Sequence, residues 1–234
     1  MSTEPDTTRA RDAIFQRIRS AQKRAAPGEA DRAAAEDYLQ RHPAGPQPAP
    51  YADLLVQFRA MAERMASTVD TVATLNDAPR AVALYLAAQG LGNQAVAWPA
   101  LRELPWAGAG LQIAFRAPQR DESQGVQPAD TVGITGAFAA IAETGTLVLL
   151  SAPDTPASTH LLPETHVAVL RAADVVATME DVFARLRSEC GGVAAMMPRA
   201  LNMVSGPSRT GDIEQTIVLG AHGPYRVHVV VALA

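Results

Sequence analysis

Short apolar segments that alternate with helical stretches most restrict the folds open to this chain of 234 residues. The segments are apolar on both faces and are separated by turns or by a helix expected at residues 179–189; they cover residues 94–98, 111–115, 131–135, 146–150, 166–170, 200–204 and 225–233. Strands of this kind are typical of a parallel sheet whose two faces are both covered, whereas the strands of a β-sandwich alternate in polarity. We therefore predict an α/β fold with a mostly parallel sheet and helices on both faces.

Helical periodicity marks the elements expected to cover this sheet. Apolar residues recur at helical spacing over residues 54–66, and a β-prone stretch at 68–74 follows. Asn76 or Asp77 can cap the next helix, and Gly90 can end it before the strand that follows. This order predicts a βαβ unit.

The N-terminal stretch has a different character. Residues 7–40 are rich in Ala, Arg and Glu and contain two helical stretches separated by a Pro-Gly pair, and the prolines of residues 42–50 then exclude a continuing helix. We predict a helical arm with a Pro-rich linker over residues 1–46 and an α/β domain over residues 47–234. The arginines of the arm could bind an acidic partner, but the acidic residues close behind them favour a solvated face.

Composition excludes several classes of function. The chain has 20 basic and 24 acidic residues, a net charge of −4 and only 5% aromatic residues, so nucleic acid is not an expected partner. Lys23 is the only lysine, which makes ATP chemistry with a P-loop lysine improbable. The longest apolar run, residues 81–88, is far shorter than the roughly 20 residues of a membrane span. With no apolar signal segment in the first thirty residues, a cytoplasmic location is expected.

A single cysteine, Cys190, limits the redox chemistry of the chain. It permits no intrachain disulfide and no iron-sulfur cluster or zinc site built from several thiolates. An iron-sulfur cluster is therefore not expected on this chain, and we predict that it binds no cofactor.

The first candidate site residue is Glu143. It lies with Thr144 and Gly145 in a turn that directly precedes the apolar segment 146–150. A carboxylate at such a turn could transfer a proton, attack an acyl carbon, contact a ligand or bond to a neighbouring loop. All of these readings remain open on sequence alone.

The second candidate is a cluster of small and polar residues, Ser205 to Glu214, after the segment 200–204. Its hydroxyls and its arginine suit a carboxylate or phosphate, and a short helix after them would add backbone donors; the groups are Ser205, Ser208, Arg209 and Thr210. Asp212 with Gln215 resembles a helix cap, which is its structural alternative. The glycine spacing differs from the G-x-S-x-G turn of hydrolases, so a serine hydrolase is disfavoured.

Histidines supply the third candidate. His222 lies between small residues in a predicted loop, where it could shuttle a proton, bind an anion or simply stabilise the turn. His228 alternates with valines and is expected to be an ordinary residue of a sheet face. His160 and His166 flank a Leu-Leu-Pro turn without a metal-binding helix motif, so no metal site is predicted.

These motifs together resemble the lactate-utilization protein C family, whose core is the LUD domain. The resemblance rests on I-A-E-T-G-T-L-V-L, on L-P with a following H-V, on S-G-P-S-R-T-G-D-I-E and on G-A-H-G-P, which begin at residues 141, 162, 205 and 220. It implies a fold similar to that of sugar-phosphate isomerases and CoA transferases. It also implies a role beside two companion iron-sulfur subunits that together oxidise L-lactate to pyruvate.

The resemblance selects motif positions but assigns none of them a chemical role; the positions are Glu143, Thr144, Ser205, Arg209, Thr210, Asp212, Glu214 and His222. The sequence departs from the expected pattern at the turn before Leu161, where Thr159 and His160 stand in place of a small residue or a serine. The role of His160 therefore stays open, as do those of Asp212 and Glu214. The iron-sulfur clusters are expected in the companion subunits.

Our first hypothesis is a subunit without iron-sulfur clusters that binds a small carboxylate through Arg209 and His222, with Glu143 assisting proton transfer. Thr144, Ser205, Ser208 and Thr210 are the other expected substrate contacts. The alternatives are a stand-alone acyl- or CoA-transferase-like enzyme that uses Glu143, and a purely structural scaffold. Neighbouring genes that encode proteins rich in cysteine clusters would favour the first hypothesis, that of a subunit.

The first hypothesis also makes a geometric prediction. Ligands of open α/β sheets bind outside the carboxyl ends of the strands. We therefore expect Glu143, Arg209 and His222 to meet at that edge of the sheet.

Overall fold

The computed structural model describes residues 7–23, 27–43, 45–47, 49, 51–121, 125–191, 197–213, 216–220 and 222–234. The chain divides into two compact units, Met1–Pro48 and Ala49–Ala234. No helix within the described ranges combines the length and the apolar character that crossing a membrane requires.

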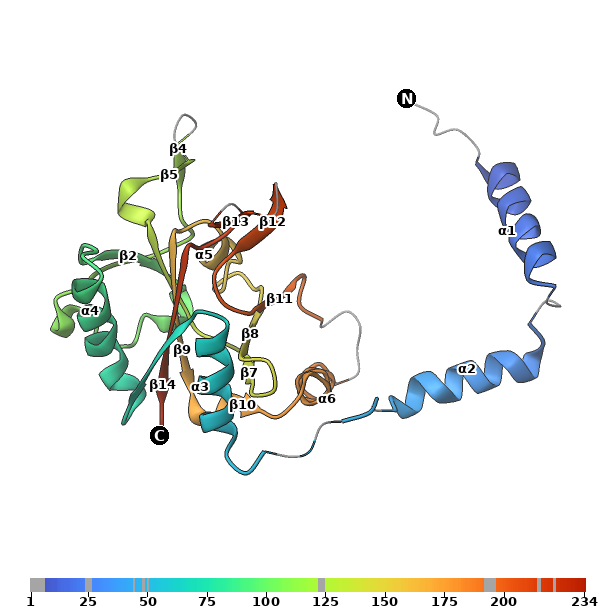
Figure 1. Cartoon of the computed structure of the whole chain (residues 1–234), viewed down its shortest axis with the longest axis horizontal. Helices are drawn as coiled ribbons and strands as arrows, with labels where there is room; N and C mark the ends of the chain where they lie inside the picture. Colours follow the sequence, from blue (N-terminus) through green and yellow to red (C-terminus); the bar gives the residue numbers. More distant parts are fainter. Residues whose placement is uncertain are drawn as a thin grey trace. The chain divides into compact units, whose positions relative to one another are not determined.

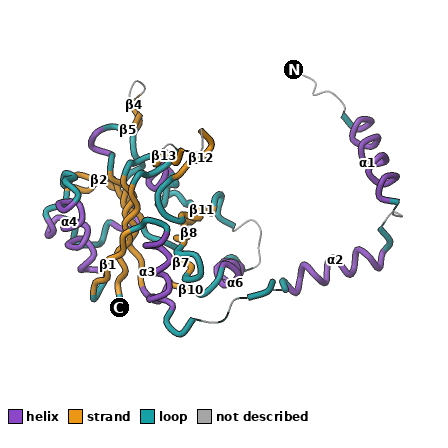
Figure 2. The backbone as a smooth tube through the Cα atoms, in the orientation of Figure 1, coloured by secondary structure: helices purple, strands orange, loops and turns teal. Residues whose placement is uncertain are grey.

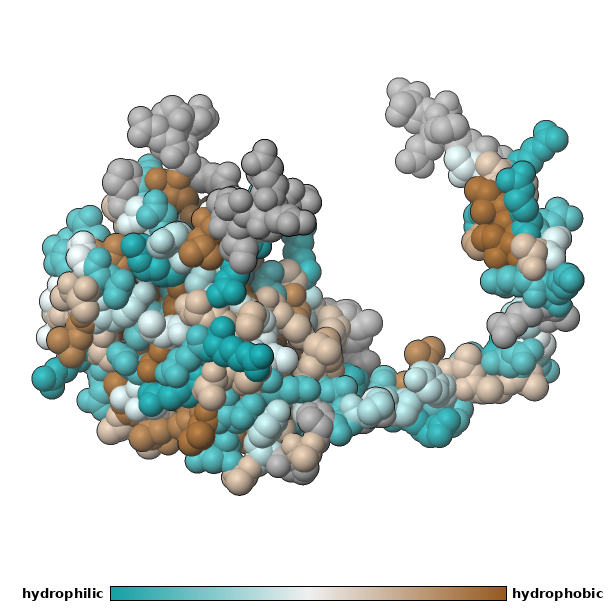
Figure 3. Space-filling view, in the orientation of Figure 1, coloured by the Kyte–Doolittle hydropathy of each residue, from teal (hydrophilic) through white to brown (hydrophobic). Residues whose placement is uncertain are grey.

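The first unit contains two helices, α1 (Thr8–Gln22) and α2 (Glu29–Arg41). Helix α2 begins after Gly28, whose backbone N–H donates to the Asp31 carboxylate at 2.8 Å. Neither helix has a buried residue, and apolar side chains gather along one side of α1 (Figure 3). Each helix is thus covered by nothing in the described chain.

The second unit is built on a sheet of six strands that all run parallel. Figure 2 draws its strands in orange, between helices in purple. In spatial order these strands are β1 (Thr68–Val72), β14 (Arg226–Ala232), β9 (Thr165–Arg171), β6 (Val132–Thr135), β2 (Gln94–Ala97) and β3 (Gln112–Phe115). The valines of β14 illustrate why the sheet is buried on both faces. Val229 packs on one side of the sheet and Val230 on the other, and both are fully buried.

Different elements cover the two faces (Figure 1). Helix α4 (Ala78–Ala88) packs on one face through Val82 and Leu86. The other face is covered by α3 (Leu54–Arg64) and by strands β7 (Ala139–Ile141) and β8 (Thr146–Leu150). Asp53 caps α3, because its carboxylate accepts the backbone N–H groups of residues 55 and 56 at 2.9 and 3.0 Å.

Strands β7 and β8 belong to a second, four-stranded sheet. Its order is β10 (Val175–Val176), β7, β8 and β11 (Leu201–Val204), with β8 antiparallel to both of its neighbours. Helix α6 (Met179–Glu189) packs against this sheet through Val182, and its bounds match the helix predicted at 179–189.

The mostly parallel sheet flanked by helices is therefore confirmed, with two corrections. The predicted strands at 146–150 and 200–204 form part of the second sheet rather than of the parallel one. The short helix predicted after Ser205 is wrong, because the chain there forms a hairpin of β12 (Arg209–Ile213) and β13 (Thr216–Leu219). Asp212 lies in β12 and not at the start of a helix.

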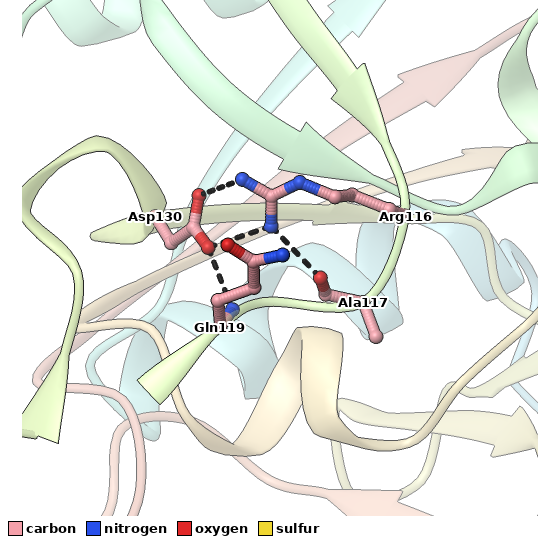
Figure 4. Close-up of polar contacts among 4 residues, drawn as sticks. All are labelled: Arg116, Ala117, Gln119 and Asp130. Carbon is pink, nitrogen blue, oxygen red and sulfur yellow. Dashed lines mark hydrogen bonds and ion pairs between the residues drawn. The ribbon is translucent and has the colours of Figure 1, made fainter. Parts of the chain in front are cut away.

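The long connection between β3 and β6 is held by a bidentate ion pair (Figure 4). The two guanidinium nitrogens Nη1 and Nη2 of Arg116 donate to the Asp130 carboxylate at 2.7 and 2.9 Å, and the backbone N–H of Gln119 donates to it at 2.7 Å. Asp130 is only 1% exposed, so these three donors replace the water that its charge has lost. The pair closes the base of a small hairpin, β4 (Arg120–Asp121) and β5 (Gly125–Val126).

The order of the strands creates one switch point. From β2 the chain passes to β3 across the face that α4 covers, whereas from β6 it passes to β9 across the opposite face. Strands β2 and β6 are neighbours, so their carboxyl ends lead in opposite directions. This is the arrangement that opens a crevice at the edge of an α/β sheet.

Candidate functional site

Two motif turns press against the C-terminal end of α3. A side chain at Gly145 would collide with the backbone of Met61 and Ala62, and one at Gly206 would collide with the carbonyl group of Met65. Both glycines also have positive φ, +64° and +81°, which glycine adopts without strain. The E-T-G-T and S-G-P-S turns therefore need glycine at these positions in order to approach the helix.

Three hydroxyl groups join these two turns. The Thr146 hydroxyl lies 2.7 Å from the Thr144 hydroxyl and 2.7 Å from the Ser205 hydroxyl. Thr146 is buried, while Thr144 and Ser205 are exposed at the two ends of the chain of hydrogen bonds. The arrangement connects residues 59 apart in the sequence, with an exposed residue at each end.

Arg209 completes this cluster from the start of β12. Its Nη2 donates to the carbonyl oxygen of Met65 at 3.1 Å, which places a cation at the negative end of the α3 dipole. The side chain is exposed, and its other N–H groups form no hydrogen bond or ion pair with another described residue. Arg209 therefore stabilises the helix end and still has donors available for an anion.

The loop that carries His222 is tied to Ser208. The backbone N–H of Ser208 donates to Pro224 and its carbonyl accepts from Gly220, both at 2.9 Å. His222 itself is exposed. The loop is thus held beside the Ser205–Arg209 turn by backbone contacts rather than by the histidine.

The structure does not link Glu143, Arg209 and His222 through polar interactions. No hydrogen bond or ion pair joins their three side chains, all of which the structure describes. Glu143 is half-buried, and its backbone N–H donates to Ala177 at 3.1 Å. Thr210 pairs with Val218 in the β12–β13 hairpin, and Glu214 lies outside the described residues.

The predicted edge of the sheet is wrong for Arg209 and His222. The backbone N–H of Tyr225 donates to the carbonyl of Glu164 at 2.7 Å, so the His222 loop lies at the amino ends of β14 and β9. The β12–β13 hairpin lies toward the end of the sheet away from the C-terminus (Figure 1). The error arose because β11, which precedes Arg209, is antiparallel to β8 and belongs to the second sheet.

His160 and His166 are buried side by side. Their ring centroids lie 5.8 Å apart, and the Nε2 atom of His166 lies 2.8 Å from the Thr135 hydroxyl. Burial lowers the pKa of His160 to about 4; burial, with a smaller contribution from His160, lowers the pKa of His166 to about 3. Both imidazoles are neutral at pH 7. His160 is thus a residue of the interior and not an exposed site residue.

His228 occupies the sheet face that its alternation predicts. Its ring stacks on Tyr85 of α4 at a centroid distance of 3.8 Å, and Nδ1 lies 2.8 Å from the Thr68 hydroxyl. Burial lowers its pKa to about 4 despite the carboxylate of Asp70, which lies 3.7 Å from Nε2. Across the described part of the chain, no group of three or more His, Cys, Asp or Glu residues is arranged to hold a metal ion.

The carboxyl edge of the parallel sheet holds a crevice of about 330 Å³ that sequence reasoning missed. Its polar lining residues are Glu103, Arg171 and Asp174. Their positions in the sequence could have indicated the crevice, because Arg171 directly follows the predicted strand 166–170 and Glu103 follows the predicted strand 94–98. No motif marks these residues, and only the order of the strands brings them together.

Comparison with known proteins identifies the family to which the chain is similar. A model of the LUD domain matches residues 116–232, half of the 234 residues. Lactate utilization protein C of Shouchella clausii is 33% identical over 114 residues, which are 48% of this chain and 49% of that protein. Lactate utilization protein C of Bacillus subtilis is 36% identical over 95 residues, or 41% and 39%. The chain spans about half the length of the curated relatives that it matches, or less.

A solved structure shows the same fold. The crystal structure of a DUF162 family protein from Deinococcus radiodurans superposes with a TM-score of 0.53 at 27% identity, over 79% of this chain and 99% of that one. Because the LUD domain model matches half of the residues, the chain belongs to the LUD domain family.

Proposed function

We propose that this chain serves lactate utilization as the subunit without iron-sulfur clusters of a complex that oxidises L-lactate to pyruvate. The observation that carries the proposal is membership of the LUD domain family together with relatives named lactate utilization protein C. Two companion iron-sulfur subunits would transfer the electrons, because Cys190 is the only cysteine of this chain and is buried.

The cluster at the end of α3 is the proposed site for the small carboxylate. Arg209 would pair with the carboxylate through the guanidinium donors that Met65 leaves available. The hydroxyls of Thr144, Ser205, Ser208 and Thr210 are the proposed neutral donors. Thr144 and Ser205 are exposed, as the role requires.

His222 and Glu143 are the proposed proton-transfer groups of this cluster. His222 is exposed on a loop held against Ser208, so it can approach a ligand bound at Arg209. Glu143 is half-buried in the turn that leads to Thr144. Because no hydrogen bond or ion pair joins these described side chains, a ligand or a companion subunit would bring them into one reaction.

Growth experiments test the role in lactate utilization. Deletion of the gene in its host should abolish growth on L-lactate and leave growth on pyruvate, the proposed product, unchanged. The full chain should restore growth on lactate, and an Arg209→Ala chain should restore it poorly. Unchanged growth of the deletion strain on lactate would refute the proposed role.

Copurification tests the partners. The tagged full chain, isolated anaerobically from lactate-grown cells, should retain cysteine-rich proteins and iron in stoichiometric amounts. If the chain elutes alone and transfers acyl groups from CoA thioesters in a manner that Glu143→Gln abolishes, the transferase alternative replaces the subunit proposal.

A further inference from the structure

The crevice at the carboxyl edge lies apart from the motif cluster, and we propose that it binds a small zwitterion, an α-amino acid with an apolar side chain. The site is distinct from the proposed carboxylate site, which lies at the amino ends of the strands. It goes beyond the proposed function, because it supplies the chain with a second small-molecule ligand.

The position of the crevice follows from the topology. Its lining includes Ala100 and Leu101 after β2, Gly136 and Ala137 after β6, and the last residues of β9. The connections after β2 and β6 lead to opposite faces of the sheet, so neither covers the space between them. Ligands of open α/β sheets bind at such a point.

Apolar and polar groups share the walls of the crevice about equally. Leu75, Leu101 and Leu104 contribute side chains to it. Gly136 leaves space there: the atoms nearest to an added Cβ would belong to the Trp98 ring and Leu101, at ordinary contact distances of 3.7 and 3.8 Å. The volume of about 330 Å³ lies at the lower end of the range for small-molecule pockets, roughly 300–1,000 Å³, and suits a ligand of amino-acid size.

The charges of the crevice are not equivalent. Asp174 is already paired, since Arg185 donates to its carboxylate at 3.0 Å. Glu103 and Arg171 are exposed, and neither forms an ion pair with another residue that the structure describes. The crevice therefore offers one unpaired anion and one unpaired cation.

A zwitterion complements this pair of charges. Its carboxylate would accept hydrogen bonds from the Arg171 guanidinium, its ammonium would donate to Glu103, and its side chain would lie on the leucines. A simple carboxylate such as lactate would pair with Arg171 alone and meet repulsion from Glu103. The charge pattern thus selects an amino acid over the hydroxy acid of the proposed function.

Four compounds with the same isobutyl group separate these possibilities: L-leucine, 2-hydroxy-4-methylpentanoate, 4-methylpentanoate and isoamylamine. Calorimetric titration of the full chain should show binding of L-leucine at least about tenfold tighter than that of the other three. Equal binding of leucine and 4-methylpentanoate, or no binding of leucine, would overturn the proposal.

Variants locate the binding. Arg171→Ala, Glu103→Gln and Gly136→Leu should each weaken leucine binding at least about tenfold. Arg102→Ala is the matched control, because its guanidinium lies over the Phe115 ring at 5.2 Å and does not line the crevice. Thermal unfolding verifies that each variant is folded. Leucine binding that survives both charge substitutions would place the ligand elsewhere and refute the site.

The companion subunits are absent from these titrations. If leucine does not bind to the chain alone, the proposed role in lactate utilization is unaffected. If the deletion strain still grows on lactate, the proposed amino-acid site is unaffected.

Discussion

The Arg209 guanidinium donates a hydrogen bond to the carbonyl oxygen of Met65 at 3.1 Å, and so ties the start of β12 to the last turn of α3. The motif arginine therefore has a structural role beside any role in binding. From sequence, Arg209→Ala is expected to leave stability unchanged, because a loop arginine that only binds a ligand contributes little to the core. The contact with Met65 changes this expectation.

Arg209→Ala should lower the free energy of unfolding by about 0.5–1 kcal/mol, since an exposed hydrogen bond and a cation at a helix C-terminus each contribute modestly. Arg209→Lys keeps the charge near the helix end and should recover part of this loss, but not the forked geometry for a carboxylate. Urea unfolding measures the stability, and titration with L-lactate and pyruvate measures the binding. Arg102→Ala is the control. Full binding by Arg209→Ala would leave Arg209 with the structural role alone.

The glycines beside α3 give a sharper prediction. Gly206→Ala should destabilise the fold more than Gly90→Ala by about 1–3 kcal/mol, the cost of overpacking. Both residues have positive φ, +81° and +67°, so the backbone strain is similar. Only at Gly206 does the new Cβ collide with a carbonyl group, that of Met65, whereas nothing lies within 4 Å at Gly90. Equal destabilisation in urea unfolding would show that the helix and the turn are not in contact.

The helical arm should be dispensable for folding. Because no residue of α1 or α2 is buried, deletion of residues 1–46 should leave a soluble domain with a cooperative thermal transition and a nearly unchanged midpoint. Scanning calorimetry of the full and shortened chains compares the two. Loss of the transition would mean that the arm contributes to the core of the second unit.

Some elements are predictable because their local pattern and their tertiary environment agree. The helix at residues 179–189 is capped by Thr178, whose hydroxyl accepts the Asp181 N–H, and its apolar spacing places Val182 and Leu186 in the interior. The strands at 94–98 and 131–135 are short, apolar and bounded by turns, and they pair with each other as interior strands of the parallel sheet. In such segments the local sequence is sufficient to predict the secondary structure.

The β12–β13 hairpin lacks these signals. Residues 209–213 contain polar side chains and a glycine without apolar alternation, and the spacing of Asp212 and Gln215 imitates a helix cap. The strand forms by pairing with residues 216–219. A preference that arises from pairing is invisible in the local sequence.

The sequence likewise predicts some features of the candidate site and not others. Glu143, Ser205 and Arg209 are identifiable by residue type, and the hydroxyl chain from Thr144 to Ser205 is consistent with their grouping. Their edge of the sheet is not identifiable, because it depends on the direction in which β11 pairs with β8. The crevice at Arg171 needs still more, namely the order of all six parallel strands.

Buried histidines make the stability depend on pH. Burial lowers the pKa of His160 and His228 to about 4 and that of His166 to about 3, against an ordinary value of 6.5 in the unfolded chain. Between these values the unfolded chain binds more protons than the folded one. The contribution of these histidines to the free energy of unfolding is therefore fully present above about pH 6.5. It falls as the pH decreases toward 4, by up to about 1.4 kcal/mol per pH unit for each histidine.

The contribution of one histidine can be isolated with His228→Phe. The substitution keeps an aromatic ring against Tyr85, loses the hydrogen bond to Thr68 and removes one of the three titrating groups. Its free energy of unfolding should be lower than that of the parent at pH 7, and the gap should narrow as the pH falls toward 4.5. Urea unfolding across this range measures both slopes. His42→Ala, at an exposed position of the arm, should leave the slope unchanged. A slope for His228→Phe equal to that of the parent would show that His228 is accessible to protons in the folded chain, and that its stack on Tyr85 opens more readily than the packing implies.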